Sequence, residues 1–195
     1  MIVVLIPSDR QIRKLHERLA PTPEAFASVH THCEIVSKIA EQLITTGDLT
    51  VDVDLVRAGC LLHDIGVDRL APGENYLRHG LLGHEILRDE GFPEYLGRFC
   101  SCHTGVGLTR ADILDQDLPL PPADYVPATE EETLVMYADK FHSKKSPPTF
   151  NTAAAYARSL HRFGAGKVTR FHALTAHFGE PDLTTLAAAY GHHIG

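Results

Sequence analysis

The stretch "AGCLLHDIGVDRL", residues 58–70, brings an apolar run directly to an adjacent histidine and aspartate. The apolar residues have the spacing of the buried side of a helix, and Gly66 is of the type that commonly ends one. Two interpretations of His63 and Asp64 are open. The pair either forms a polar last turn at the protein surface or binds a metal ion, and the rest of the chain has to decide between them.

The composition is that of an ordinary globular protein. The chain has 195 residues, of which 44% are hydrophobic and 22% charged, enough for one domain with a sizeable core. Its 18 basic and 25 acidic residues give a net charge of −7, which argues against binding to a nucleic acid duplex or to an anionic membrane surface. No segment approaches the roughly 20 apolar residues of a membrane span. The apolar start, residues 1–6, is too short for a signal peptide, and we interpret it as a stray terminus or part of the core edge.

The cysteines indicate the cellular compartment of the protein, and the histidines indicate where a functional site could lie. The four cysteines, Cys33, Cys60, Cys100 and Cys102, form no C-x-x-C pair and are too sparse for a disulfide framework. We therefore expect buried, reduced thiols and a cytoplasmic protein. The 13 histidines are well above ordinary usage, so the position of each one matters.

Capping patterns and glycines divide the chain into helices with few strand signals. Ser8 with Gln11 is the pattern of a capping box, Thr22-Pro23 begins the next helix, and a long helix then passes through His32. Further helices are expected from Asp52 to Gly66, over about 79–90 and 93–102, after Thr109, from a second capping box at Thr129 and Glu132 through Asp139, and two or three times beyond residue 147. The prolines within 104–129 indicate an ordered connector or lid.

The pattern predicts an all-α fold in a single domain, residues 1–195. Its core spans about 26–145, and a C-terminal helical extension spans about 147–195.

Helical spacing sorts the ionisable side chains by face. Residues three, four and seven apart share a face, which places His32, His79, His103 and Asp139 on apolar stripes. His30 instead falls among charged residues and is predicted to face solvent. Each inward residue taken alone is more often an ordinary core residue than a ligand. Burying all of them without a partner costs several kcal/mol each. A divalent cation offsets that cost, and mixed imidazole and carboxylate ligands suit a transition metal, so we favour the metal-binding interpretation.

The order of these residues resembles that of the HD superfamily of metal-dependent phosphohydrolases. "LLHDIG", residues 61–66, is similar to the family hallmark, and "YADKF", residues 137–141, is similar to its closing aspartate motif. "RHGLLGHEIL", residues 78–87, and "CHTGVGLT", residues 102–109, resemble the subset of the family that builds a two-metal site. The resemblance covers about residues 26–145.

The resemblance implies a compact helical bundle with a metal site between its helices. Carried over by matching position, the implied ligands are His32, His63, Asp64 and Asp139 for a first metal, and Asp64, His79 and His103 for a second. The implied cofactor is a divalent transition metal (Fe, Mn, Zn, Co or Ni), one or two per chain. The implied reaction is hydrolysis of a small phosphoester, with a nucleotide as one candidate, by a metal-activated hydroxide. Asp64 and Lys140 are the catalytic candidates.

Some positions depart from the family pattern. Val67 stands where many relatives have lysine, and neither the GYP signature nor the doubled histidine of cyclic-dinucleotide phosphodiesterases is present. Other cations near the motifs, Arg78, Lys144 and Lys145, are interpreted as solvated surface charges. His192 and His193 are interpreted as a frayed end.

Other functions stay open beside the phosphohydrolase. Some HD relatives use the same ligands in a mixed-valent diiron oxygenase, and a non-catalytic module could use the metal only to bind a ligand or brace the helices. A structural zinc site at Cys100, Cys102 and His103 is a minor option, because its spacing fits no common zinc template. The expected partner is a small phosphorylated substrate, with no nucleic acid duplex and no membrane. Formation of a homodimer stays open.

Overall fold

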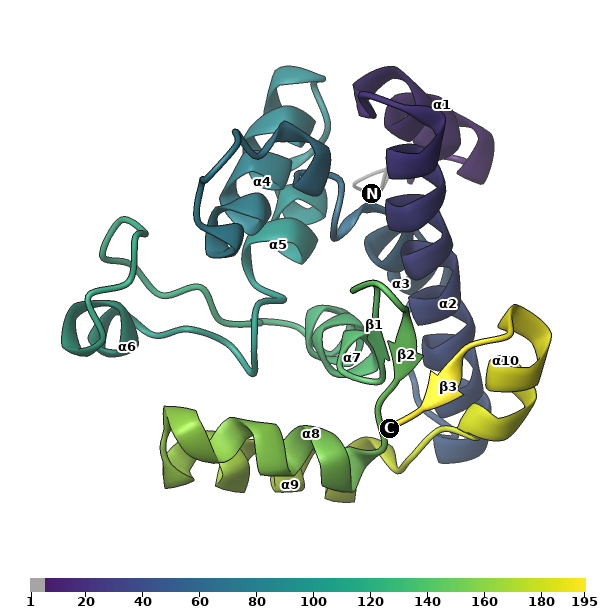
Figure 1. The fold of residues 1–195 in the computed structure, drawn as a ribbon, viewed down its shortest axis with the longest axis vertical. Coiled ribbons are helices and arrows are strands. Elements are labelled where there is room, and N and C mark those ends of the chain that lie inside the picture. The colour runs from purple at the N-terminus through teal and green to yellow at the C-terminus, as the bar shows by residue number, and fades with distance from the viewer. Residues whose placement is uncertain (1–5) are drawn as a thin grey trace.

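The computed structural model describes residues 6–195, so the interpretation of the apolar start falls, for residues 1–5, outside the described residues. Over the described range the chain forms helices and a few two-residue strands (Figure 1). The α-helices are α1 (Asp9–Leu19), α2 (Pro23–Gly47), α3 (Val53–Leu62), α4 (His79–Asp89), α5 (Glu94–Ser101), α6 (Arg110–Asp115), α7 (Glu130–Asp139), α8 (Ala153–Leu160), α9 (Ala165–Phe178) and α10 (Leu183–Tyr190). Short 3₁₀ helices cover Val67–Arg69, Tyr76–Arg78 and His161–Phe163, and the strands are β1 (His142–Ser143), β2 (Thr149–Phe150) and β3 (His193–Ile194).

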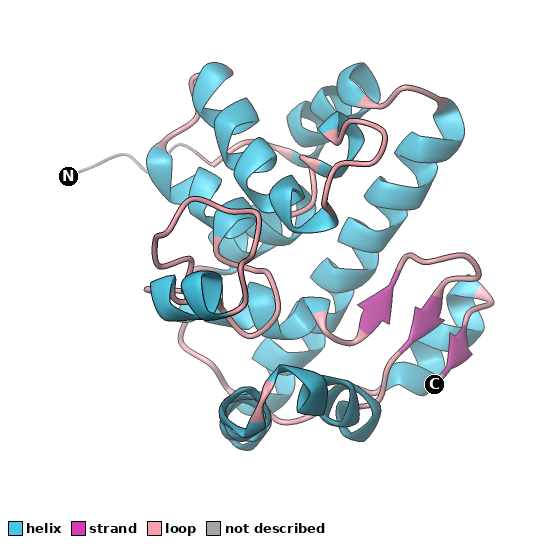
Figure 2. Ribbon diagram, turned by 60° about the vertical axis from the view of Figure 1, so that its left-hand side comes forward, coloured by secondary structure: helices cyan, strands magenta, loops and turns pink. Residues whose placement is uncertain are grey.

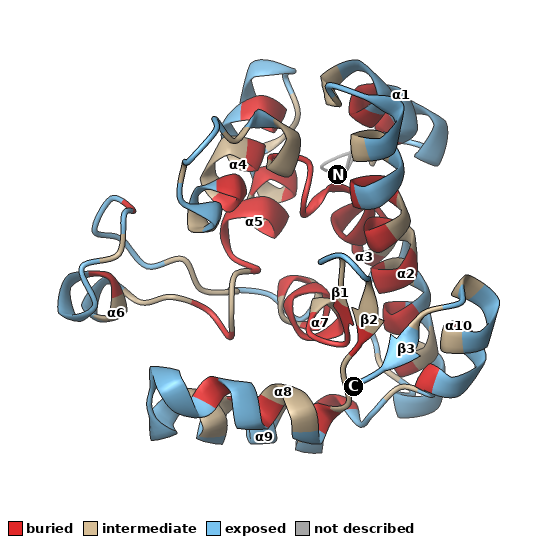
Figure 3. Cartoon of the chain, viewed as in Figure 1, coloured by how far each residue is buried: buried red, intermediate tan, exposed pale blue. Residues whose placement is uncertain are grey.

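Helix α3 lies at the centre of the bundle. It contacts α1, α2, α5 and α7, and the buried residues of the chain gather around these helices (Figure 3). Every residue of α3 from Ala58 to Leu62 is buried, as the apolar pattern before the histidine–aspartate pair predicts. On the other side of the bundle α8 and α9 pack together, and the Tyr137 hydroxyl of α7 donates a hydrogen bond to the Gly179 carbonyl after α9 (2.7 Å). The all-α fold class and the helical bundle are confirmed.

The strands form a small sheet in the order β1-β2-β3 (Figure 2). β1 pairs with β2 antiparallel, whereas β3 pairs with β2 in parallel, with His193 opposite Thr149. The Gly195 N–H donates to the Phe150 carbonyl (2.8 Å) and anchors the chain end. The interpretation of residues 192–193 as a frayed end is therefore wrong. Two-residue strands are too short for an alternating pattern to reveal them in the sequence.

The second capping box is only half formed. The Thr129 hydroxyl accepts a hydrogen bond from the Glu132 N–H (3.2 Å), as predicted for the start of α7. The Glu132 carboxylate does not return to Thr129 but accepts hydrogen bonds from the Arg98 guanidinium (2.7 Å) and the Ala128 N–H (2.7 Å). This buried carboxylate thus ties α7 to α5 instead of completing the box.

The turn after α3 differs from its prediction. The helix ends at Leu62, so His63 is its C-cap, and Gly66 has an ordinary backbone conformation (φ −77°) rather than the left-handed one of a helix-ending glycine. A Cβ atom at Gly66 would lie 2.0 Å from the His79 carbonyl oxygen and 2.3 Å from the Gly83 nitrogen. The glycine is needed because the turn packs directly on the backbone of α4.

Helix α1 covers the outer face of α2 and α3. His16 of α1 is buried and donates its Nε2–H to the Leu61 carbonyl (2.8 Å), while burial lowers its pKa to about 4. His30 is also buried, stacked on Phe26 with 5.0 Å between ring centroids and edge-on to His16 at 5.5 Å. The prediction that His30 faces solvent is wrong, because helix periodicity shows which residues share a face but not which neighbouring helix covers it.

The cysteines and the lengths of the helices test two further predictions. All four cysteines are buried and free, which confirms the prediction of buried thiols. Among residues 6–195 there is no helix with the length and apolar character required to cross a membrane.

The close approach at Gly66 predicts the effect of adding one methyl group. Gly66→Ala should lower the free energy of unfolding by about 1–3 kcal/mol, because neither backbone neighbour can move aside cheaply. Urea denaturation measures this change. The control is Gly166→Ala in α9, where a Cβ meets nothing within 4 Å and stability should be unchanged or slightly raised. Equal stability of Gly66→Ala and wild type would contradict the packing argument.

The buried His16 predicts a stability that depends on pH. Its pKa is about 4 in the folded chain against the ordinary 6.5 of a solvated histidine, so the unfolded chain takes up the proton first as the pH falls. Stability is then lost between about pH 6.5 and 4, by at most about 3 kcal/mol from this residue. We expect His16→Gln, which can keep the hydrogen bond to the Leu61 carbonyl, to flatten this part of the profile. Urea denaturation across the pH range, with chelator present, tests it; identical slopes would refute it.

Candidate metal centre

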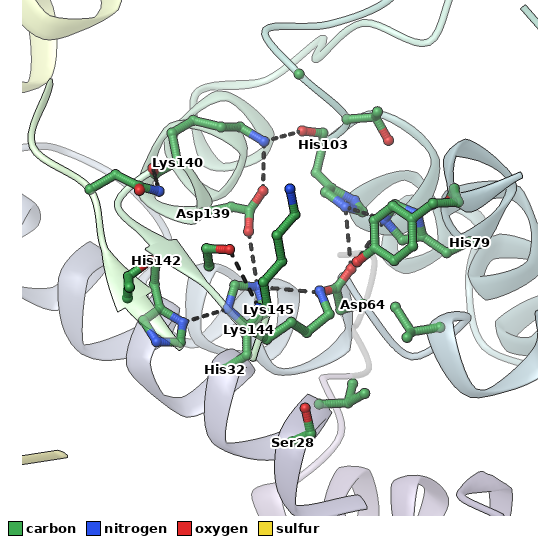
Figure 4. Close-up of a pocket in the computed structure, with 18 of the residues that line it drawn as sticks. Ser28, His32, Asp64, His79, His103, Asp139, Lys140, His142, Lys144 and Lys145 are labelled. Atoms are coloured by element: carbon green, nitrogen blue, oxygen red, sulfur yellow. Dashed lines mark hydrogen bonds and ion pairs between the residues drawn. The ribbon is translucent and has the colours of Figure 1, made fainter. Parts of the chain in front are cut away.

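Five separate segments bring the predicted ligands together. The contributing residues are His32 in the middle of α2, His63 and Asp64 after α3, His79 at the start of α4, His103 after α5 and Asp139 at the end of α7. The four histidines and Asp64 are buried, and Asp139 has a side chain only 16% exposed. Figure 4 shows most of these side chains directed toward one another around a cavity.

The first group of donor atoms consists of His32, His63 and Asp139, with one atom from each lying within 4.8 Å of the others. Asp139 Oδ1 lies 3.0 Å from His32 Nε2 and 3.4 Å from His63 Nε2. Asp64 joins this group through Oδ2, which lies 3.2 Å from His32 Nε2. The arrangement offers two imidazole nitrogens and two carboxylates to one point.

The second group uses the other oxygen of the same aspartate. Asp64 Oδ1 lies 3.1 Å from His79 Nε2 and 3.5 Å from His103 Nε2. His63, Asp64 and His103 also form a set whose donor atoms all lie within 4.8 Å of one another. One carboxylate therefore faces both groups, with a different oxygen toward each.

The hydrogen bonds of the histidine rings fit a metal. His63, His79 and His103 each direct Nδ1 at the main-chain carbonyl three residues earlier. A carbonyl only accepts, so Nδ1 carries the proton, and in a neutral ring Nε2 is left with a lone pair. In two neutral rings, the lone pairs of His79 and His103 face each other across 2.9 Å between the Nε2 atoms. A cation between them relieves this repulsion, and such outer hydrogen bonds are typical of metal-ligating histidines.

The charges around the site favour ionised carboxylates. Burial opposes ionisation of Asp64, yet the nearby Lys144 ammonium and the His63 ring hold its pKa well below the usual range. Asp139 likewise has a pKa well below its usual range despite burial, because Lys140 and the His32 ring stabilise its charged form. Burial lowers the pKa of His103 to about 4, which keeps this ring neutral and able to bind a cation near neutral pH.

Lys140 is buried against the first group. Its Nζ donates to Asp139 Oδ2 (2.6 Å) and to the His103 carbonyl (2.9 Å). These two hydrogen bonds tie the end of α7 to the segment after α5, and they orient one ligand aspartate.

Lys144 is the residue that sequence analysis misjudged most. Its ammonium forms an ion pair with Asp64 Oδ2, its side chain is only 17% exposed, and Nζ lies 5.4 Å from the centre of the Tyr76 ring. The interpretation as a solvated surface charge is wrong. The residue follows β1 in a segment with no helical periodicity, so no pattern in the sequence shows that this segment folds over the site.

His142 also lines the site and His192 contacts His142, although neither residue was predicted to lie there. His142 Nδ1 lies 2.8 Å from His32 Nδ1, and His142 Nε2 lies 3.0 Å from His192 Nδ1. Burial and the neighbouring His32 lower the pKa of His142 to about 3. His142 lies three residues after Asp139 and so continues its helical spacing in the sequence, but its partner His192, 50 residues later, is brought close by the small sheet.

A cavity of about 880 Å³ opens beside the ligands. Its wall includes Tyr76 and Lys145 near the two groups of donor atoms. Asn151, Tyr156 and Arg162 from the C-terminal half also line it. The volume lies within the range of small-molecule sites in proteins. Polar and cationic groups on this wall suit an anionic molecule.

Residues 29–144, more than half of the chain, match the family model described as HD domain. The chain belongs to the HD domain family. The resemblance drawn from the motifs around His63 and Asp139 is thereby confirmed. The helices that carry the ligand candidates of this HD domain lie within or overlap the matched range.

Three related proteins match this chain over part of their own length. An uncharacterized protein of Methanocaldococcus jannaschii is 44% identical over 115 residues, which cover 57% of this chain and 64% of the relative. A protein of Picrophilus torridus named tRNA (cytidine(56)-2'-O)-methyltransferase is 38% identical over 57% of this chain, but over only 30% of its own length. A protein of the same name from Thermoplasma volcanium is 39% identical over 70% of this chain and 37% of its own length. The chain thus spans less than two thirds of each of these relatives.

Solved structures share the fold. The HD domain of the L. monocytogenes phosphodiesterase PgpH aligns with a TM-score of 0.52 and 18% identity, covering 93% of this chain and 100% of that one. The same domain in complex with cyclic-di-AMP aligns with a TM-score of 0.52 over 95% of this chain and 99% of that one. At this level of identity the likeness shows the common fold.

The two donor groups predict how many metal ions bind. We expect wild-type protein loaded with Mn²⁺ to retain two ions per chain after gel filtration, and His79→Leu to retain one. Elemental analysis gives both counts. The control is His84→Leu on the same helix, whose ring hydrogen-bonds Ser101 and Glu94 instead and which should retain two. A count of one in wild type would restrict the site to the first group.

Proposed function

We propose that this chain is a metal-dependent phosphohydrolase that acts on a small phosphoester. The observation that carries the proposal is the placement of Asp64 between two imidazole groups at the wall of a cavity large enough for a small molecule. In this proposal the ligands are His32, His63, Asp64 and Asp139 for one ion, and Asp64, His79 and His103 for the other. Divalent ions bound there would neutralise phosphoryl oxygens and lower the pKa of water toward neutrality.

The lysines have different parts in this proposal. Lys140 has both of its hydrogen bonds within the protein, so it holds Asp139 in position, and direct contact with substrate stays a prediction. Lys144 stands at the cavity beside Asp64 and supplies a positive charge for a substrate phosphate. Lys145 lines the same cavity and is exposed, and no carboxylate pairs with it within residues 6–195. An anionic substrate is the chemistry that these charges favour.

The comparisons bear on the substrate only in part. The PgpH domain in complex with cyclic-di-AMP is an example of this fold with a nucleotide phosphodiester, so a nucleotide stays the candidate substrate here. The methyltransferase names support no second candidate, because this chain matches only 30% and 37% of those proteins. The division into a core of about 26–145 and an extension of about 147–195, the cytoplasmic location, the identity of the metal and the homodimer stay predictions.

A phosphoester panel tests the proposal. Protein loaded in turn with Mn, Fe, Co, Ni or Zn should hydrolyse at least one of a set of nucleotide monoesters, nucleotide diesters and p-nitrophenyl phosphate. Asp64→Asn removes the charge shared by both groups and should lower kcat by about 100-fold or more. The control Asp89→Asn alters an exposed carboxylate at the end of α4 and should retain wild-type kcat.

Other outcomes would favour the alternatives. Iron-loaded protein that hydrolyses no phosphoester but changes its optical spectrum with O₂ would favour the diiron oxygenase. Metal-loaded protein that is inert in both assays would instead favour a module that only binds ligands.

A further inference from the structure

His32 differs from the other three candidate ligand histidines in what holds its ring. The others direct Nδ1 at main-chain carbonyls, which can only accept, so the position of the ring proton is determined. His32 directs Nδ1 at another imidazole, His142 Nδ1, 2.8 Å away. Because an imidazole nitrogen can donate or accept, this contact alone does not determine which nitrogen of His32 carries the proton.

A second contact continues the chain of rings. His142 Nε2 lies 3.0 Å from His192 Nδ1, and His142 lies edge to edge between His32 and His192, with centroid separations of 5.1 and 5.2 Å and interplanar angles of 26° and 19°. His142 is 5% exposed and packs against Phe150, while His192 is half-buried next to β3. The three rings therefore form a continuous row from the metal centre to the edge of the small sheet.

The direction of the hydrogen bonds along this row decides the state of His32. When His142 Nε2 donates to His192 Nδ1, a neutral His142 has only a lone pair on Nδ1, so it accepts from His32 Nδ1. His32 then presents the lone pair of Nε2 to the site. In the opposite direction the proton of His32 sits on Nε2, 3.0 Å from Asp139 Oδ1, where it blocks coordination.

We infer that His142 and His192 are positioning residues that hold His32 in the tautomer and orientation needed to bind a metal. They do for His32 what main-chain carbonyls do for the other three histidines. In this inference β3 contributes to the metal centre. β3 pairs with β2 and β2 pairs with β1 in the small sheet (Figure 2), and His192, just before β3, lies beside His142. His192 lies outside the matched residues 29–144, and the inference rests on the metal site of the proposed function.

Binding of Mn²⁺ alone, measured by isothermal titration calorimetry on the full chain, tests the inference. His142→Phe keeps an aromatic ring in the row but cannot accept from His32, and it should weaken Mn²⁺ binding by about 10- to 100-fold. His142→Asn can place its Oδ1 where His142 has Nδ1 and accept the same hydrogen bond. It should restore binding to within about fivefold of wild type, a rescue that depends on the hydrogen bond and not on packing.

Variants at residues 192 and 193 distinguish the contribution of His192 to metal binding from that of its neighbour His193. His192→Phe should weaken Mn²⁺ binding by about three- to tenfold. His142 stays in place, but no acceptor at residue 192 then fixes the direction of the hydrogen bond between His142 and His32. The control His193→Phe alters an exposed residue of β3 and should bind as wild type does. The melting temperature of each variant in chelator reports on folding without metal.

Each result supports or overturns the inference. If folded His142→Phe binds Mn²⁺ as tightly as wild type, or if His142→Asn loses as much affinity as His142→Phe, the inference is wrong. If His142→Phe fails to fold, His192→Phe decides: unchanged affinity overturns the role of the chain end. Wild-type protein that binds none of Mn, Fe, Co, Ni and Zn would overturn the proposed function as well, whereas tight binding without phosphoester hydrolysis would overturn the phosphohydrolase alone.

Discussion

The carboxylate of Asp64 is ionised with only 1% of the residue exposed to solvent, and the rest of the site is arranged to compensate for that charge. An isolated buried charge costs far more than one domain can tolerate. Imidazole nitrogens therefore approach both carboxylate oxygens, and Lys144 approaches from a segment that is distant in sequence. The same concentration of negative charge and nitrogen donors is what a divalent cation requires. Stability and the proposed metal affinity thus depend on one group.

Such a site needs a rigid frame, because each ligand comes from a different segment. The second half of the central helix α3, Ala58–Leu62, is buried, and the turn after it packs so closely on α4 that only glycine fits at residue 66. This contact sets the distance between Asp64 and His79, the first residue of α4. Main-chain carbonyls then orient the rings of His63, His79 and His103. The backbone of the bundle is therefore part of the candidate metal centre.

Helical periodicity explains how much of this could be predicted. His32, His79 and Asp139 lie on apolar helix faces, and His103 continues the apolar spacing of α5 just beyond its end. A face that is buried at several positions is buried at the others too. The same logic failed at His30, since its polar stripe is covered by α1, a tertiary contact that periodicity does not encode. It could not reach Lys144 or His192, which lie outside the helices, in and beside a sheet of two-residue strands. The ligands followed local rules, whereas the residues around them depend on long-range packing.

This division has a consequence for specificity within the family. The ligand candidates lie in residues 29–144, the range that the HD domain model describes, whereas Asn151, Tyr156 and Arg162 on the cavity wall come from β2–α8 and the turn after it. The candidate metal ligands and much of the wall that a substrate would touch thus belong to different parts of the chain. Changes in the C-terminal segment can alter the cavity while the ligands stay in place. A fold of this kind can keep its metal chemistry and change its substrate, which explains why family membership alone does not identify the molecule that is bound.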